Sequence, residues 1–232
     1  MYNWYSNPCT NGAANCSQNP ALQFIPTLWS NASALTSVWP SNVELALSRG
    51  TKSLFSFNEP DVCYPGSACM DIPSAVSTYK SSMMPYRGRA LLGAPAVTNA
   101  GAPYGLSWLS NFMGNCTGCH FDFVNVHWYS NVYAGANYFE SFINQTRQVA
   151  AGRPIVVTEF ALDGTNAFTE AQNEAFLTTV MDWMDRQSDI MGYAYFMDAA
   201  GLLMDGAGRD RTALGDVYQN EWGGVIKGGM PA

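Results

Sequence analysis

The stretch Ser53–Asp61 reads Ser-Leu-Phe-Ser-Phe-Asn-Glu-Pro-Asp, and the interpretation of the chain starts from it. Its first residues are small or apolar without a polar alternation, which is typical of a strand buried on both faces of a parallel sheet. Pro60 cannot donate a hydrogen bond to a β-ladder, so we expect the strand to stop before it. Glu59 is therefore predicted to be a carboxylate at the end of a buried strand.

Similar runs and helical patterns alternate along the rest of the chain. The other runs are Tyr2–Tyr5, Gln23–Trp29, Ala90–Val97, Asp122–Tyr129, Pro154–Phe160 and Gly192–Met197, with a faint eighth near Leu202–Met204. The helical patterns lie at about Asn42–Arg49, Pro73–Met84, Gly105–Asn115, Asn137–Ala151 and Thr169–Ser188. This β-α order predicts an α/β fold, a compact (β/α)8 barrel. The alternative is an open doubly wound sheet, but no Gly-rich phosphate loop follows the first run.

Length and composition narrow the class of protein. The 232 residues fit one domain, or at most two small ones, and we expect a single domain, 1–232, and a monomer. The net charge is −7 with only 11 Lys and Arg, so a nucleic-acid partner is not expected. No apolar run approaches the length of a membrane span, and no cofactor or metal is expected. Aromatic residues make up 13% of the chain, and flat rings suit a neutral, hydroxyl-rich ligand.

The six cysteines fall into three pairs that are close in sequence. We expect the disulfides Cys9–Cys16, Cys63–Cys69 and Cys116–Cys119, the last with a redox or metal motif as its alternative. Glycosylation sequons begin at Asn31, Asn115 and Asn144. Paired cysteines together with sequons predict a secreted, extracellular protein, and Met1 is interpreted as a start that replaces a removed leader.

Two of the seven glutamates end apolar runs, and these are the candidate catalytic residues Glu59 and Glu159. A strand-end acid can simply meet solvent or cap the next helix, but a carboxylate at a buried position is costly unless it is paired or functional. Two carboxylates at strand ends suit glycoside hydrolysis, in which one protonates the leaving oxygen and the other attacks the sugar carbon or activates water. Asp61, just beyond Pro60, competes with Glu59 for the role of the acid.

Other hydrolytic chemistries lack their signatures. The chain contains neither a Gly-x-Ser-x-Gly elbow nor a His-Glu-x-x-His motif, and its two histidines have no local triad pattern.

The run Asp122–Tyr129 places Asn125, His127 and Tyr129 on one face, because side chains alternate along a strand. We expect this face to look into the barrel mouth, where His127 and Tyr129 hydrogen-bond a sugar or orient a carboxylate. The alternative is a satisfied core histidine with Tyr129 at the rim. The tryptophans Trp4, Trp29 and Trp128 lie at or next to strand ends, where they either stack on sugar rings or pack in the core. Asn99, after Ala90–Val97, and Tyr195 are further candidate contacts to the substrate.

Five segments together resemble a known family. They are Phe24–Trp29, Phe57–Asp61, Gly93–Asn99, Phe123–Tyr129 and Thr158–Phe160. In order and spacing, from about Tyr2 to Met197, they resemble the Asl1-like glycosyl hydrolase catalytic domain, glycoside hydrolase family 128. The Asn-Glu-Pro triplet is shared by many clan A hydrolases, whereas the third and fourth segments are more specific.

The resemblance implies a (β/α)8 barrel and a retaining β-1,3-glucanase, expected to cleave internally. It implies that Glu59 is the acid/base and Glu159 the nucleophile, that Asn58 holds the sugar 2-hydroxyl or the nucleophile, and that His127 and Tyr129 surround the nucleophile. The substrate would be a laminarin-like β-1,3-glucan of a cell wall. The alternatives are a clan A hydrolase acting on β-1,4-glucan or mannan, and a non-catalytic protein that binds β-glucan oligosaccharides.

Overall fold

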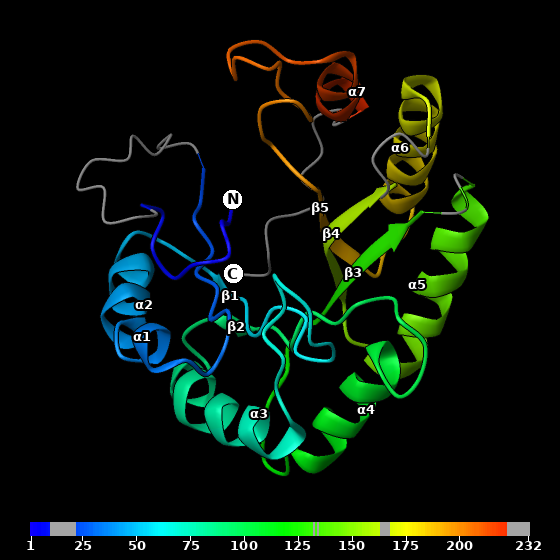
Figure 1. The fold of residues 1–232 in the computed structure, drawn as a ribbon. Helices are drawn as coiled ribbons and strands as arrows, with labels where there is room; N and C mark the ends of the chain where they lie inside the picture. The colour runs from blue at the N-terminus through cyan, green and yellow to red at the C-terminus, as the bar shows by residue number, and fades with distance from the viewer. Residues whose placement is uncertain (10–21, 132, 134, 163–167, 222–232) are drawn as a thin grey trace. The chain divides into compact units, whose positions relative to one another are not determined.

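The computed structural model describes residues 1–9, 22–131, 133, 135–162 and 168–221. The chain divides into two compact units, Met1–Asn125 and Val126–Ala232, and each is described by itself below. Figure 1 shows the order of the helices and strands along the chain.

Parallel strand segments form the centre of the first unit. The strands β1 (Ser53–Leu54) and β2 (Leu91–Leu92) pair in parallel, with Ser53 opposite Leu91. Backbone hydrogen bonds continue the pairing on either side, because Leu28 N donates to Phe55 O at 3.0 Å and Ala94 N donates to Phe123 O at 3.0 Å. The segments 23–29, 53–59, 90–97 and 122–125 therefore lie next to one another in chain order. This confirms parallel sheet structure from the predicted runs.

Two of the predicted strands are less regular than expected. The run Tyr2–Tyr5 forms no strand and bends at Trp4 and Tyr5, although Thr27 N still donates to Tyr5 O at 3.0 Å. The reason is Trp4, whose φ of +62° interrupts an extended backbone. The Gln23–Trp29 run contributes a single bridge, from Thr27 to Phe55, and Pro26 within it has no N–H to donate.

One of the four described α-helices of the first unit begins at a side-chain cap. The four are α1 (Ser33–Thr36), α2 (Trp39–Ser48), α3 (Ile72–Thr78) and α4 (Gly105–Asn115). Asp71 caps α3 by accepting a hydrogen bond from Ser74 N at 2.7 Å. The predicted helix Pro73–Met84 is divided, because α3 passes into the π-helical turn η2 (Tyr79–Met83) and the 3-10 turn η3 (Met84–Tyr86), which contains Pro85.

A three-stranded sheet forms the centre of the second unit. Its order is β3 (Val124–Ser130), β4 (Ile155–Leu162) and β5 (Ile190–Tyr195), where the first two residues of β3 belong to the first unit. The strands β4 and β5 are parallel, with Ile155 opposite Ile190 and Phe160 opposite Tyr195. The buried pattern of β4 has no alternation, as the sequence predicts for a strand covered on both faces.

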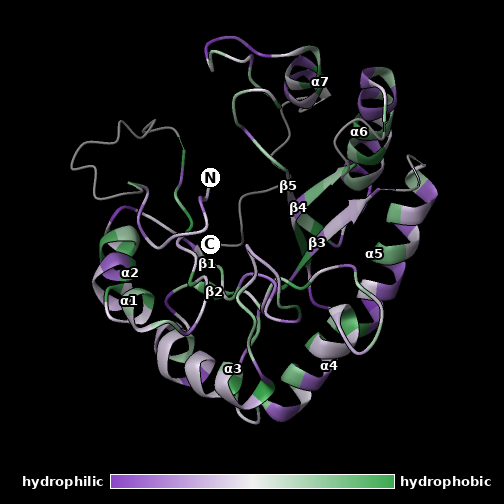
Figure 2. Ribbon diagram, viewed as in Figure 1, coloured by the Kyte–Doolittle hydropathy of each residue, from purple (hydrophilic) through white to green (hydrophobic). Residues whose placement is uncertain are grey.

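The helices α5 (Ala136–Ala150) and α6 (Glu170–Asp185) pack against β4. Figure 2 shows hydrophilic and hydrophobic residues on α5, and its buried residues include Phe139, Phe142 and Ile143 at helical spacing. A Thr169–Gln172 capping box begins α6. The helix α7 (Ala213–Glu221) contacts α6 and was not predicted, and the faint strand Leu202–Met204 is instead a turn bridged at Met204 to Ala200 and Arg211.

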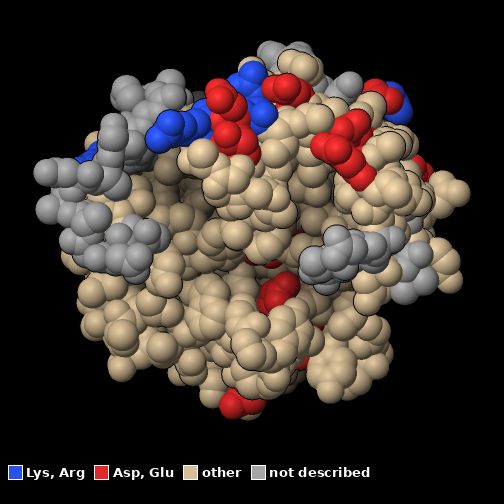
Figure 3. Space-filling view, turned by 45° about the horizontal axis from the view of Figure 1, so that its top comes forward, with Lys and Arg blue, Asp and Glu red and all other residues tan. Residues whose placement is uncertain are grey.

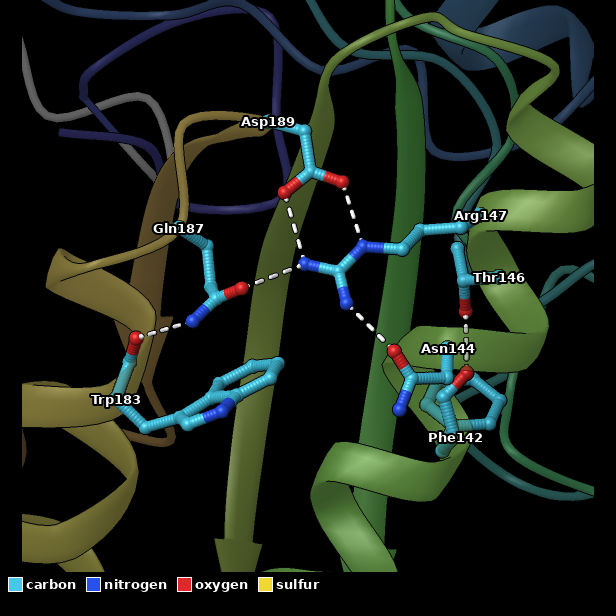
Figure 4. A network of polar contacts seen from close by, with 7 residues as sticks. All are labelled: Phe142, Asn144, Thr146, Arg147, Trp183, Gln187 and Asp189. Carbon is cyan, nitrogen blue, oxygen red and sulfur yellow. Dashed lines mark hydrogen bonds and ion pairs between the residues drawn. The ribbon is translucent and has the colours of Figure 1, made fainter.

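A polar network joins α5 to the chain that enters β5 (Figure 4). Arg147 Nε donates to Asp189 Oδ2 at 2.6 Å, and its Nη2 donates to Asp189 Oδ1 at 2.8 Å and to Gln187 Oε1 at 3.0 Å. Its Nη1 donates to Asn144 Oδ1 at 2.6 Å, and the guanidinium lies 5.6 Å from the Trp183 ring centre. Hydrogen bonding from Arg147 lowers the pKa of Asp189. The network holds the end of α5 at a fixed place against the sheet.

Two of the three predicted disulfides are confirmed, Cys63–Cys69 and Cys116–Cys119. Cys9 is disulfide-bonded, and its predicted partner Cys16 lies outside the described residues.

Within the described ranges, no helix is both long enough and apolar enough to cross a bilayer.

Candidate active site

Glu59 ends the run in the first unit with an unusual backbone conformation. Its φ is +46°, in the left-handed region that a glutamate rarely adopts and that costs of order 1–3 kcal/mol. The conformation is held by Glu59 N, which donates to Ala96 O of the neighbouring segment at 2.7 Å. The side chain is 5% exposed. A buried carboxylate on a strained strand end is a feature of functional sites rather than of a strand that merely ends.

The Glu59 carboxylate has a phenol partner that the sequence analysis did not identify. Tyr64 Oη donates a hydrogen bond to Glu59 Oε2 at 2.6 Å. The sequence did contain a signal for it, since Tyr64 lies five residues beyond Glu59 between two closely spaced cysteines. Asn58, next to Glu59, is buried and its Nδ2 donates to Gly66 O at 3.1 Å. The amide thus holds the loop that carries Tyr64, and the predicted contact with a sugar 2-hydroxyl stays a prediction.

Asp61 has a structural role that separates it from Glu59. Its carboxylate accepts three hydrogen bonds, from Thr98 Oγ1 at 2.6 Å, Thr98 N at 3.2 Å and Gly105 N at 2.9 Å. Gly105 has a φ of +52°, and a Cβ there would lie 2.2 Å from Ala100 O, so only glycine fits. A buried acceptor with three donors joins the loops after two strands, and this arrangement argues against Asp61 as a proton donor.

Glu159 is the corresponding carboxylate of the second unit. It lies within β4, is 6% exposed, and accepts a hydrogen bond on Oε2 from Tyr129 Oη at 2.6 Å. The Nδ1 atom of His127 is 3.3 Å from the same oxygen. Both partners come from the adjacent strand β3, where residues two apart share a face, as the sequence predicted for them. The arrangement fixes the direction of the carboxylate.

Asn125, the third polar residue of that face, does not belong to this cluster. It is fully buried, and neither polar atom of its amide has a hydrogen-bond partner among the described residues. Its Nδ2 would lie 3.0 Å from a Cβ placed on Gly93, whose lack of a side chain lets the two segments approach. Asn125 therefore lies in the interior, as buried as His127 on the same face, and the expectation that the face looks into the mouth stays a prediction.

The aromatic candidates divide into partly exposed and buried rings. Trp128 is completely buried and stacks on Phe176 with ring centres 5.3 Å apart, so the expectation that it stacks on a sugar is wrong. Tyr195 is 8% exposed among Phe160 and Tyr218, and burial raises its pKa to about 12. Packing accounts for most of the Tyr195 ring, and its predicted contact with substrate stays a prediction.

Three other candidates keep part of their surface accessible. Trp4, Trp29 and Asn99 are each partly exposed, so the structure leaves surface on them for a ligand. Most of the described surface in Figure 3 belongs to residues without charge. The other histidine, His120, pairs with Asp122, with Nε2 and Oδ1 2.8 Å apart. Neutral surface with few charges suits a neutral ligand.

Comparison with known proteins gives a consistent family. The family model described as glycosyl hydrolase catalytic core matches residues 1–218. The alkali-sensitive linkage protein 1 of Schizosaccharomyces pombe is 31% identical over 159 residues, which are 66% of this chain and 28% of that protein. The chain therefore matches little more than a quarter of that relative's length.

Solved structures show the same fold. A curdlan-specific exo-β-1,3-glucanase of family 128 from Blastomyces gilchristii, in complex with glucose, is 29% identical with a TM-score of 0.77, over 94% of this chain and 87% of that one. An endo-β-1,3-glucanase of family 128 from Amycolatopsis mediterranei, in complex with laminaritriose, is 25% identical with a TM-score of 0.73, over 95% and 89% of the two chains. The family model and these relatives agree with the resemblance carried by the sequence segments, and the chain therefore belongs to the glycosyl hydrolase catalytic core family, among the proteins similar to family 128.

Proposed function

We propose that this chain is a retaining β-1,3-glucanase, with Glu59 as the acid/base and Glu159 as the nucleophile. The support is the family, whose model runs through both units, together with relatives that are named as β-1,3-glucanases. The proposal treats residues 1–232 as one catalytic domain. It also takes the fold to be a (β/α)8 barrel, which the chain-order pairing of the parallel segments in the first unit supports.

The observation that carries the proposal is the surroundings of Glu159. A hydroxyl at 2.6 Å and an imidazole nitrogen at 3.3 Å meet one oxygen of a buried carboxylate. These contacts fix the direction of the carboxylate, which a nucleophile requires. The Glu59 carboxylate accepts a hydrogen bond from the phenol of Tyr64, and the backbone of Glu59 is left-handed. Two carboxylates in unlike environments suit unlike roles in one reaction.

The reaction follows from these roles. Glu59 gives its proton to the glycosidic oxygen while that oxygen leaves the sugar, and Glu159 forms a bond to the sugar carbon. Water then attacks the sugar carbon and displaces Glu159, while Glu59, now ionised, takes a proton from that water. A retaining pair requires carboxyl groups about 5–5.5 Å apart, against roughly 6.5–9.5 Å for an inverting pair. Asn58, Trp29, Asn99 and the hydroxyl of Tyr129 are proposed to contact the glucan.

The first experiment tests the substrate class. Release of reducing ends is measured side by side on laminarin, carboxymethylcellulose and mannan. We expect laminarin to be cleaved and the other two to be left intact. Preference for either of them would instead identify a clan A hydrolase of other specificity. Binding of laminari-oligosaccharides without turnover would identify a non-catalytic protein.

The second experiment tests the pair. Glu159→Gln should abolish turnover while oligosaccharide binding is kept, and Glu59→Gln should spare only substrates whose leaving group needs no proton. Proton NMR of the first product should show the β-anomer, and α-product would contradict retention. Early release of several oligosaccharide lengths would support the predicted internal cleavage. We also propose that the protein is secreted, since paired cysteines suit an oxidising compartment. A monomer remains part of the proposal.

A further inference from the structure

We propose that Tyr64 is a positioning residue for Glu59 and that the loop closed by the Cys63–Cys69 disulfide exists in this chain to hold it. The inference rests on the proposed role of Glu59 as the acid/base. The hydrogen bond from Tyr64 Oη to Glu59 Oε2, at 2.6 Å, is the observation from which it starts. The χ3 torsion of a glutamate has no sharp preferred value. One short hydrogen bond to one oxygen therefore selects the rotation of the carboxyl group.

The bond also has a chemical consequence. When Glu59 gives its proton to the leaving oxygen, a carboxylate develops, and a hydroxyl donor bonds a carboxylate more strongly than a neutral acid. The interaction with Tyr64 is therefore stronger in the transition state than before it, and such an interaction accelerates the step. Glu59 loses the proton, the glycosidic oxygen gains it, and Tyr64 keeps its own.

The loop that carries Tyr64 is built to hold one shape. Ser67 N donates to Tyr64 O at 3.1 Å across Pro65 and Gly66, and Gly66 has the φ of +98° that a type II turn requires. Ser67 Oγ accepts from Tyr64 N at 3.0 Å and donates to Val62 O at 2.9 Å. The disulfide between Cys63 and Cys69 closes this turn covalently.

The same loop is anchored on both sides of Glu59. Asn58 Nδ2 donates to Gly66 O at 3.1 Å, and Asn58 O accepts from Ala68 N at 2.8 Å. Beyond Glu59, Pro60 O accepts from Met70 N at 2.9 Å. The loop and the strand end therefore form one hydrogen-bonded piece, and Tyr64 keeps its place relative to the carboxylate.

A purely structural role for the hydroxyl fits the exposure of Tyr64 poorly. The residue is 51% exposed, although its hydroxyl is directed to a carboxylate that is 5% exposed. A half-exposed ring contributes little burial, so its loop does not depend on it for a core contact. What the loop fixes is the position of one hydroxyl group.

The test compares Tyr64→Phe with the wild type on two aryl β-laminaribiosides. The 2,4-dinitrophenyl leaving group departs without a proton, whereas the phenyl leaving group needs one. The ratio kcat/KM reports the first chemical step for both. We expect Tyr64→Phe to lower kcat/KM for the phenyl substrate about ten-fold, the lower end of the effect of losing one hydrogen bond to a charged group. For the 2,4-dinitrophenyl substrate, kcat/KM should change less than about two-fold. Tyr104→Phe, which removes a hydroxyl from another exposed tyrosine of the same unit, should change neither.

A second variant tests the loop itself. The Cys63→Ser, Cys69→Ser double variant opens the covalent closure and leaves Tyr64 in place. The double variant should show a smaller fall in kcat/KM on the phenyl substrate and little change on the 2,4-dinitrophenyl substrate. Its thermal unfolding midpoint is measured alongside to separate this effect from a loss of stability. Equal losses on both substrates, or no loss on either, would overturn the inference for Tyr64.

Glu59→Gln serves as the reference for the proposed function. If it impairs the phenyl substrate selectively while Tyr64→Phe does not, only the inference about Tyr64 fails. If Glu59→Gln impairs both substrates equally, Glu59 is not the acid, and the proposed function and the inference fail together.

Discussion

Tyr129 and Glu159 are joined by a 2.6 Å hydrogen bond between neighbouring strands, from the phenol Oη to the carboxylate Oε2. The two residues are 30 positions apart in the chain, and their strands β3 and β4 lie side by side in one sheet. The bond restrains the direction of the proposed nucleophile.

Tyr129→Phe should therefore lower the turnover of laminarin. A hydrogen bond to a charged group contributes about 1.5–3 kcal/mol, so we expect kcat to fall roughly ten- to hundred-fold. Initial rates of reducing-end release measure it. Tyr138→Phe is the control, because it removes a hydroxyl from a partly exposed ring on α5. Unchanged kcat in Tyr129→Phe would show that Glu159 does not depend on this donor.

Asp61→Asn should destabilise the protein rather than remove a proton donor. Replacing one carboxylate oxygen by an amide nitrogen leaves at least one of the three donors from Thr98 and Gly105 without an acceptor. The cost of a buried unsatisfied group is about 1–3 kcal/mol, which urea unfolding measures. Asp182→Asn, in an exposed pair with Arg186, should change the free energy of unfolding far less. A fully folded but inactive Asp61→Asn protein would return Asp61 to the role of the acid.

Two glycines at either end of α4 should respond in opposite directions to alanine. Gly105→Ala places a Cβ 2.2 Å from Ala100 O at a φ of +52°, so we expect a loss of more than about 1 kcal/mol in the free energy of unfolding. Gly114→Ala lies in the same helix with nothing within 4 Å of its Cβ, and should stabilise by roughly 0.5–1 kcal/mol. Thermal or urea unfolding of both variants distinguishes them. Equal effects would mean that the α4 start tolerates a side chain.

The Arg147–Asp189 ion pair should make stability depend on pH in the acidic range. Hydrogen bonding from Arg147 lowers the pKa of Asp189 from its ordinary 3.8. A lowered pKa in the folded state means that the stabilisation is complete above the ordinary pKa and is lost as pH falls through the folded value. The pair is partly exposed, so we expect about 1 kcal/mol at neutral pH.

The measurement compares the wild type with Asp189→Asn in urea at several pH values. The difference in free energy of unfolding should be largest near neutrality and shrink at the acidic end. A difference that stays constant with pH would show that the carboxylate charge is not what stabilises this corner of the second unit.

The sequence predicted the parts of the site that follow strand periodicity. Glu59 and Glu159 were found because each ends an apolar run, and His127 and Tyr129 because alternate residues share a face. The same alternation places Trp128 on the opposite face, where it meets Phe176 of α6, so strand periodicity also predicts its burial.

Features that depend on loop geometry were harder to predict. Tyr64 reaches Glu59 only because a Pro-Gly turn and a disulfide bring it back, and no periodicity describes that path. The strand at Tyr2–Tyr5 fails for the conformation of one residue, Trp4, whose φ of +62° no composition indicates. The helix α7 has nine residues, so its apolar residues Leu214, Val217 and Tyr218 form a helical pattern of little more than two turns.

Asp61 makes the loops after two neighbouring strands a single piece, because Thr98 and Gly105 both donate to its carboxylate. Neither loop can be lengthened or shortened alone without moving the other and the first turn of α4. A loop graft intended to change the length of glucan that is accepted would therefore need to exchange both loops together. Otherwise it would need to be placed after other strands.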